Sequence, residues 1–244
     1  MTAWSDQVLL GRQAALGRLC HFWGGDLRTI VYVDGYNLYY GLLRKSKFKW
    51  LDVVALFRDH ALNDEANVIE VRYYTAPVLG KMSDNSESPR RQRQYLQALR
   101  KTHPTGLTII EGRIKSSTPY QRLVSPIPEA PYLTKVQVYN FSEKKTDVNI
   151  ASDIIAGAWT DSYDQMVLCS NDSDLEGALA TLNKHHQNKR IGIVAPISGE
   201  DHRRISNDLS QYATWTKILS PVHLANAQMP ERIPHSKLVK PTTW

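Results

Sequence analysis

Residues 166–179, MVLCSNDSDLEGAL, place a short apolar run directly against two aspartates. The run 166–169 predicts a buried strand, because continuous apolar sequence suits a strand covered on both faces. Apolar side chains then return at helical spacing: Leu175, Ala178, Leu179 and Leu182. Asp172 and Asp174 therefore stand where a buried strand becomes a helix. Two interpretations remain open here, helix capping, with Ser173 and Glu176 as a capping box, or a metal site.

The same alternation of strand and helix runs along the chain from residue 28. Apolar, strand-like runs lie at 29–35, 67–77, 107–114, 165–170, 190–196 and 214–219. Helical patterns separate most of them. This order predicts an α/β fold, with a mostly parallel central sheet covered by helices on both faces. Residues 115–141 contain four prolines and interrupt the alternation, which indicates an inserted hairpin or an edge strand.

Length and composition indicate the class of protein. A chain of 244 residues that is 42% hydrophobic and 22% charged predicts one globular domain at about 28–220. We expect an N-terminal extension at 1–27 and a C-terminal tail at 221–244. No apolar run is long enough to span a bilayer, and Arg12 and Arg18 interrupt any signal-peptide pattern. Two cysteines, Cys20 and Cys169, form no disulfide framework, so we expect a cytoplasmic location.

A moderately basic balance favours polyanionic partners. The formal net charge is +6 and the sequence pI is about 9.2. The predicted helix 88–101 carries Arg90, Arg93 and Arg100 along one side. These arginines form either an ordinary solvated face or a phosphate-binding face.

Four aspartates are expected at one edge of the sheet. Asp34 follows the first predicted strand, while Asp172 and Asp174 follow the strand at 165–170. Ligands of open parallel sheets bind beyond the carboxyl ends of the strands. Asp147 shares a helical stripe with apolar residues that pack on the sheet, so it points toward the same edge.

Each aspartate alone has an ordinary explanation. Asp34 could form a turn with the glycine after it, and Asp147 could be a first-turn helix carboxylate. Carboxylates that converge on one edge repel one another unless a cation neutralises them. Together they therefore predict a site for Mg²⁺ or Mn²⁺, both of which prefer oxygen ligands. Asn37 either orients a carboxylate or water there or caps the next helix.

Three segments, in this order, resemble the NYN domain family of the PIN-like nuclease superfamily, which includes bacterial LabA-like proteins. They are VDGYNLYYG (33–41), KKTDVNIASDI (144–154) and SNDSDLEGAL (170–179). The resemblance covers about 28–200 and implies a PIN-like three-layer α/β/α sandwich. It also implies a Mg²⁺ or Mn²⁺ site at Asp34, Asp147, Asp172 and Asp174, with Asn37 beside them. Lys144 matches a lysine that often precedes the helical aspartate.

Three positions depart from the family pattern. Asn171 replaces a glycine, Leu175 replaces an aromatic residue, and Lys145 stands where glycine is common. None of these changes removes a predicted ligand. They bear on loop geometry and on substrate fit.

The resemblance implies a metal-dependent endoribonuclease acting on RNA. Single-stranded RNA is expected because Tyr36, Tyr39 and Tyr40 could stack bases, although Tyr39 and Tyr40 also suit a helix core. Arg90, Arg93, Arg100 and Lys144 are the expected substrate-binding residues. A non-catalytic RNA- or protein-binding module is one alternative, and whether the chain forms a homo-oligomer stays open. The other alternative is an NADH- and flavin-dependent hydroxylase of pyridine-type aromatics, although no G-x-G-x-x-G motif is present.

Overall fold

A computed structural model describes residues 26–82, 85–198 and 203–244. Its centre is a six-stranded sheet in the order β10-β9-β8-β1-β2-β3, and every neighbouring pair is parallel. The strands are β1 (Leu27–Asp34), β2 (Ala66–Thr75), β3 (Leu107–Glu111), β8 (Gln165–Cys169), β9 (Arg190–Ala195) and β10 (Trp215–Ile218). The chain builds outward from β1 to β3 on one side and from β8 to β10 on the other. The order therefore reverses between β1 and β8, the position where ligands bind in such sheets.

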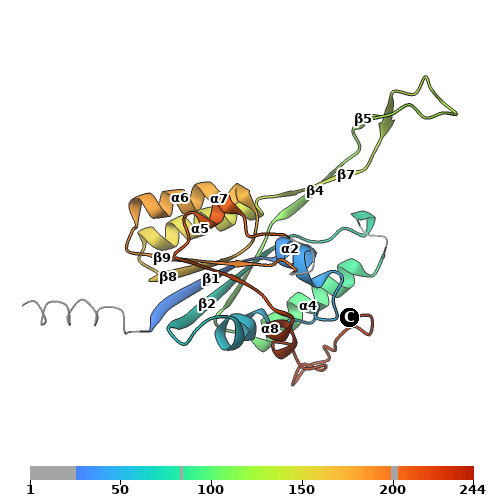
Figure 1. Cartoon of the computed structure of the whole chain (residues 1–244). Helices are drawn as coiled ribbons and strands as arrows, with labels where there is room; N and C mark the ends of the chain where they lie inside the picture. Colours follow the sequence, from blue (N-terminus) through green and yellow to red (C-terminus); the bar gives the residue numbers. More distant parts are fainter. Residues whose placement is uncertain (1–25, 83–84, 199–202) are drawn as a thin grey trace, which may run out of the picture.

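Helices cover both faces of this sheet (Figure 1). The helices of the first face are α2 (Gly35–Leu38) with its continuation η1 (Tyr39–Leu43), α3 (Val53–Ala55) with η2 (Leu56–Ala61), α4 (Ser88–Thr102) and α8 (Pro221–Asn226). Those of the second face are α5 (Thr146–Trp159), η4 (Ser173–Leu175), α6 (Glu176–His185) and α7 (Asn207–Ser210). A short turn, η3 (Gly80–Met82), precedes α4. The predicted three-layer α/β/α sandwich is confirmed.

Alternation along β1 separates two apolar cores. Val31 and Val33 face the first core, with α2, α3 and α4. Ile30 and Tyr32 face the second, with α5 and α6. All four side chains are buried because helices cover both faces of the strand.

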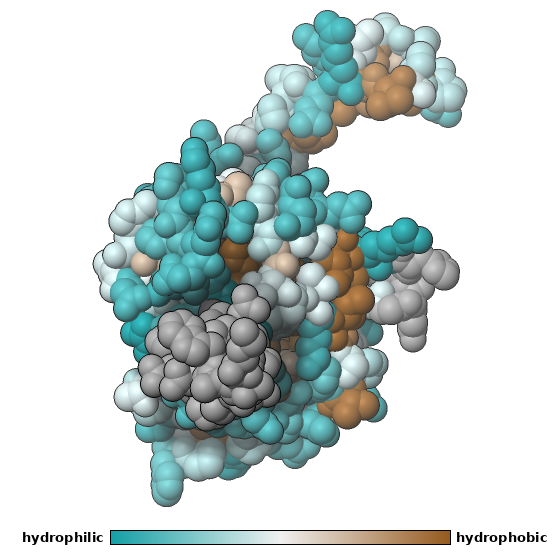
Figure 2. Space-filling model, turned by 60° about the vertical axis from the view of Figure 1, so that its left-hand side comes forward, coloured by the Kyte–Doolittle hydropathy of each residue, from teal (hydrophilic) through white to brown (hydrophobic). Residues whose placement is uncertain are grey.

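The proline-containing stretch forms an arm that projects from the body (Figure 1). It consists of two antiparallel pairs, β4 (Arg113–Ser117) with β7 (Asn140–Lys144) and β5 (Tyr120–Arg122) with β6 (Lys135–Gln137). Of the two structures that the sequence left open, the inserted hairpin is therefore the one observed. Tyr120, Tyr132 and Tyr139 are exposed on the arm, and Figure 2 shows apolar patches among its polar surface.

The C-terminal segment, expected from the sequence to be a tail, packs against the first face. Its apolar side chains Leu224, Ala227, Met229 and Ile233 are buried in the first core. The indole of Trp50 donates to the Pro230 carbonyl at 2.9 Å. The N-terminal extension lies almost wholly outside the described residues. None of the described helices is long and apolar enough to cross a membrane.

Candidate metal centre

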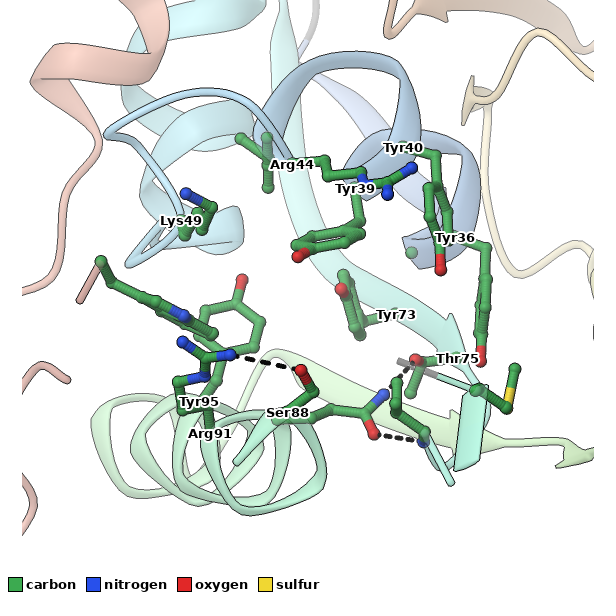
Figure 3. Close-up of a pocket in the computed structure, with 16 residues that line it drawn as sticks. Tyr36, Tyr39, Tyr40, Arg44, Lys49, Tyr73, Thr75, Ser88, Arg91 and Tyr95 are labelled. Atoms are coloured by element: carbon green, nitrogen blue, oxygen red, sulfur yellow. Dashed lines mark hydrogen bonds between the residues drawn. The ribbon is translucent and has the colours of Figure 1, made fainter. Parts of the chain in front are cut away.

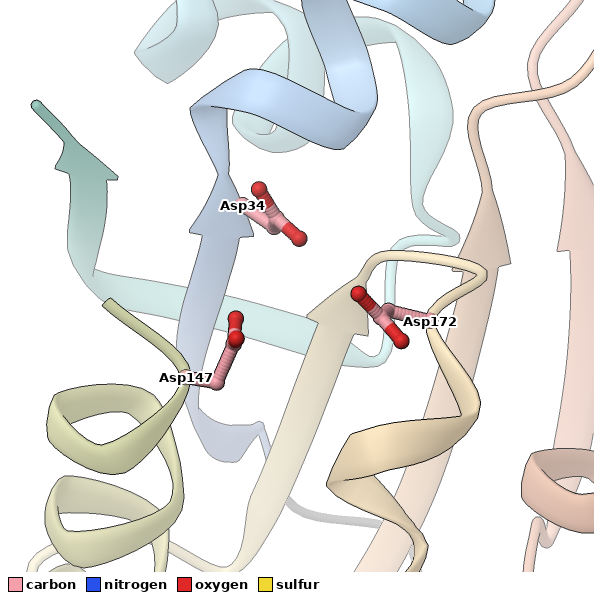
Figure 4. Close-up of side chains that lie close together, drawn as sticks. All are labelled: Asp34, Asp147 and Asp172. Carbon is pink, nitrogen blue, oxygen red and sulfur yellow. The ribbon is translucent and has the colours of Figure 1, made fainter. Parts of the chain in front are cut away.

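Three aspartates meet at the carboxyl end of the sheet, where the strand order reverses. Asp34 ends β1, Asp172 lies in the loop after β8, and Asp147 lies in the first turn of α5. One oxygen from each carboxylate lies within 4.8 Å of the other two (Figure 4). Asp174, the fourth aspartate expected there, is exposed and lies outside this group of three.

Asp34 is held from two sides. Its Oδ1 accepts the backbone N–H of Asn37 at 2.9 Å, which caps α2, and its Oδ2 accepts the Ser170 hydroxyl at 3.0 Å. The residue is 4% exposed. Burial raises the pKa of Asp34 above its ordinary value, and the nearby charge of Asp172 adds to the rise.

Ser170 and Asn37 tie the two strand ends together. The Ser170 oxygen also accepts the backbone N–H of Asp172 at 3.1 Å, while Asn37 Oδ1 accepts the N–H of Asn171 at 3.1 Å. The loop after β8 is thereby fixed against the turn after β1. Sequence reasoning did not single out Ser170. The sequence feature that could have identified Ser170 is its position, as a small polar residue between an apolar strand and an aspartate pair.

Capping and clustering both occur at Asp172. Its Oδ1 accepts the Asp174 N–H at 3.1 Å and so caps η4. Ser173 does not provide this cap, and Glu176 accepts a bond from the Tyr212 hydroxyl at 3.3 Å instead. The capping box expected at Ser173 and Glu176 is not found in the described residues; Asp172 itself caps η4, with a carboxylate that also belongs to the cluster.

Asp147 is placed by the unusual start of α5. Lys145 precedes the helix with a φ of 86°, and Glu143 accepts the Thr146 N–H at 3.3 Å. Burial, followed by the charges of Asp34, Asp172 and Glu143, raises the pKa of Asp147 to about 6. The charged form is thus disfavoured by partial dehydration and by neighbouring like charge.

The donor set fits a hard divalent cation. All three clustered groups are carboxylates, the ligands that Mg²⁺ and Mn²⁺ prefer. Neighbouring carboxylate charges add to the raised pKa of Asp34 and of Asp147, and a bound cation would remove that repulsion. Three protein ligands also leave coordination positions for water or a phosphate.

The predicted cationic residues lie on α4 and β7. Arg90 pairs with Glu87 at 3.1 Å, and Arg100 pairs with Glu111 at 2.8 Å. Arg93 on α4 and Lys144 on β7 are exposed. A cation that sequence reasoning missed is Arg91, which lines a pocket on the first face of the sheet. The sequence feature that could have identified Arg91 is its spacing of four residues from the buried Tyr95, which puts both on one face of the helix.

Comparison with known proteins places this geometry in a family. The family model of the NYN domain matches residues 28–216. The chain is 33% identical over 237 residues to a Pseudomonas putida protein named 6-hydroxy-3-succinoylpyridine 3-monooxygenase HspA, covering 89% of this chain and 75% of that protein. A crystal structure of a Vibrio parahaemolyticus protein of unknown function aligns with a TM-score of 0.46 and 18% identity, over 81% of this chain and 96% of that one. The matched region holds most of the sheet, the helices from α2 to α7 and the three clustered aspartates, and the chain belongs to the NYN domain family.

Proposed function

We propose that this protein is a divalent-metal-dependent ribonuclease that hydrolyses phosphodiester bonds in single-stranded RNA. The observation that carries the proposal is the meeting of Asp34, Asp147 and Asp172 at the strand-order reversal. Membership of the NYN domain family supports a nuclease-type activity.

The residues at this edge would have two roles, metal binding and positioning of the loops. Asp34, Asp147 and Asp172 would hold Mg²⁺ or Mn²⁺, while Ser170 and Asn37 keep the two loops in register. The bound ion would supply charge neutralisation at the scissile phosphate and acidify a water. Partial burial excludes bulk water and strengthens electrostatic interactions at this edge.

The arm supports an RNA partner. Between residues 113 and 145 it carries six basic residues against two acidic ones, namely Arg113, Lys115, Arg122, Lys135, Lys144 and Lys145 against Glu129 and Glu143. Its exposed tyrosines alternate with these cations. Aromatic stacking combined with phosphate attraction is the usual basis of single-strand binding. The arm leaves the body directly after β3 and returns directly before α5, beside the cluster.

The decisive experiment is cleavage of a labelled single-stranded RNA with Mn²⁺. Asp34→Asn and Asp172→Asn should each lower the rate by at least about a hundredfold, the scale of losing a charge-stabilising group. Asp64→Asn, an exposed carboxylate at the opposite end of the strands, is the matched control and should cleave normally. Mn²⁺ should also raise the melting temperature of the wild type but not of Asp172→Asn. Metal stabilisation without cleavage of any RNA would contradict the ribonuclease proposal.

A second candidate is hydroxylation of a pyridine-type aromatic with NADH and flavin. The name of the Pseudomonas relative is the observation that favours it. It predicts NADH oxidation that depends on added flavin and on 6-hydroxy-3-succinoylpyridine. A non-catalytic module, the third possibility, predicts a melting temperature that is indifferent to Mn²⁺ and no turnover in either assay.

A further inference from the structure

An aromatic pocket lies on the first face of the sheet, between η1, the end of β2 and α4 (Figure 3). Its volume is about 180 Å³. The tyrosines of its wall are Tyr36, Tyr39, Tyr40, Tyr73 and Tyr95. Trp244 of the C-terminal segment also lines it, with its ring centroid 5.9 Å from that of Tyr95.

The pocket is separate from the aspartate cluster. Side chains alternate between the two faces of β1, so Asp34 is on the same face as Ile30 and Tyr32, which pack in the second core. Tyr73 packs in the first core. Gly35 lines the pocket and directly follows Asp34 in the chain. An added Cβ at Gly35 would lie 2.7 Å from the Tyr73 ring. The two sites adjoin at the end of β1, where burial and the charge of Asp34 raise the pKa of Tyr73, but they share no side chain.

Three cations line the pocket. One of them, the exposed Arg44, places its guanidinium 5.5 Å from the centroid of the Tyr40 ring. Lys49 and Arg91 occupy the end opposite Tyr36 and Tyr40 (Figure 3). Lys49 donates to the Ser46 carbonyl at 2.7 Å, and Arg91 donates to Thr243 Oγ1 at 2.8 Å. Neither forms an ion pair with a carboxylate among residues 26–82, 85–198 and 203–244, and no acidic side chain lines the pocket. Burial and the charge of Arg91 lower the pKa of Lys49.

Two uncompensated, partly buried cations at the end of an aromatic cavity favour an anion that carries a flat ring. A charge-assisted bond to a carboxylate would relieve the like-charge repulsion there. Size restricts the ring, because an apolar cavity of about 150 Å³ accommodates benzene. A cavity of about 180 Å³ suits one ring with a small substituent better than it suits a nucleotide.

We propose that this pocket binds a monocyclic aromatic acid, with its ring among the tyrosines and its anionic group at Lys49 and Arg91. The proposal stands on residues outside the aspartate cluster, so it holds whether or not that cluster cleaves RNA.

Calorimetric titration of the full chain tests the proposal. The probes are benzoate, 4-hydroxybenzoate and nicotinate, each paired with its neutral amide, together with uridine 5′-monophosphate. At least one acid should bind with a Kd below about 1 mM, and its amide should bind at least about tenfold more weakly. Arg91→Gln and Lys49→Gln should each weaken acid binding about tenfold without changing amide binding. Arg90→Gln, the adjacent arginine on the exposed side of α4, should change nothing.

Three results would overturn the proposal. One is no binding of any acid by a chain that melts cooperatively. Another is equal binding of acids and amides, since the cations would then play no part. The third is tighter binding of the nucleotide than of every acid, which would assign the pocket to RNA. If Arg91→Gln lowers the melting temperature, the Lys49→Gln variant provides the test, because Lys49 donates to the Ser46 carbonyl three residues away.

Discussion

Gly35 lines the aromatic pocket and directly follows Asp34 in the chain. A Cβ there would lie 2.6 Å from the Tyr74 carbonyl oxygen, a backbone atom that cannot move aside cheaply. Any larger residue would therefore push α2 away from β2 and displace the cap that holds Asp34.

We predict that Gly35→Ala lowers the free energy of unfolding by about 1–3 kcal/mol, the usual cost of overpacking. Gly177→Ala is the control, because a Cβ there meets nothing within 4 Å. It should stabilise α6 by about 0.5–1 kcal/mol. Urea denaturation gives the free energy of unfolding of each variant. Equal denaturation midpoints for Gly35→Ala and Gly177→Ala would refute the steric argument.

Asp147 makes stability depend on pH in the metal-free protein. Its folded pKa of about 6 exceeds the ordinary value of 3.8, so the folded state binds more protons between these values. Stability from this group is complete below about pH 4 and is lost as the pH rises through about 6.

Asp147→Asn should therefore stabilise the metal-free protein at pH 7 by on the order of 1 kcal/mol, after allowing for solvent screening of a partly exposed group. The gain should shrink toward pH 4, where the folded carboxyl is protonated and the unfolded one, with its ordinary pKa of 3.8, is about half protonated. Thermal melts with a chelator at pH 4, 5, 6 and 7 measure this difference. A gain that is the same at every pH would rule out the linkage.

At the scale of elements, the start of α5 positions the second-face carboxylate. Lys145 adopts the left-handed conformation that glycine adopts without steric cost. The strain is local to the turn that leads from the arm into the helix bearing Asp147.

We expect Lys145→Gly to raise the free energy of unfolding by about 1 kcal/mol, because the Cβ clash disappears. Lys144→Gly, in the extended strand β7, should instead destabilise by about 0.5–1 kcal/mol. Chemical denaturation distinguishes the two substitutions. Destabilisation by both would show that the side chain of Lys145 outweighs its backbone strain.

At the scale of the whole molecule, the C-terminal segment completes the first layer. Met229 donates its N–H to the Trp50 carbonyl at 3.0 Å, and Asp52 donates to the Ala227 carbonyl at 2.8 Å. The segment thereby covers η2 and brings Trp244 to the aromatic pocket.

Ile233→Ala should cost about 2–4 kcal/mol, because Ile233 is 1% exposed in the first core. Val222→Ala, at a position that is 65% exposed on α8, should change stability by less than about 0.5 kcal/mol. The difference in thermal midpoint between the two variants measures how firmly the segment is packed. Comparable small effects would mean that it behaves as a tail in solution.

Much of the fold could be predicted from local patterns. Continuous apolar strands that alternate with helices require a parallel sheet covered on both faces, and the six predicted strands at 29–35, 67–77, 107–114, 165–170, 190–196 and 214–219 are all found in it. Asp34 lies at the end of one of these strands and Asp172 follows another, so their arrival at one edge also followed from the sequence.

Other features depended on contacts between residues far apart in the chain. Only the strand order placed β1 beside β8, which allows Ser170 to bond Asp34 and leaves Asp174 exposed. Packing of residues 221–244 had no periodic signal, because short irregular segments bury apolar side chains one at a time. The aromatic pocket draws on η1, β2, α4 and the C-terminal segment, and no single stretch contains its pattern. The sequence by itself determined the architecture and the edge at which its carboxylates gather, since both follow from local periodicity. Tertiary structure alone decided which carboxylates meet and which cations remain uncompensated, because those depend on distances that periodicity does not set.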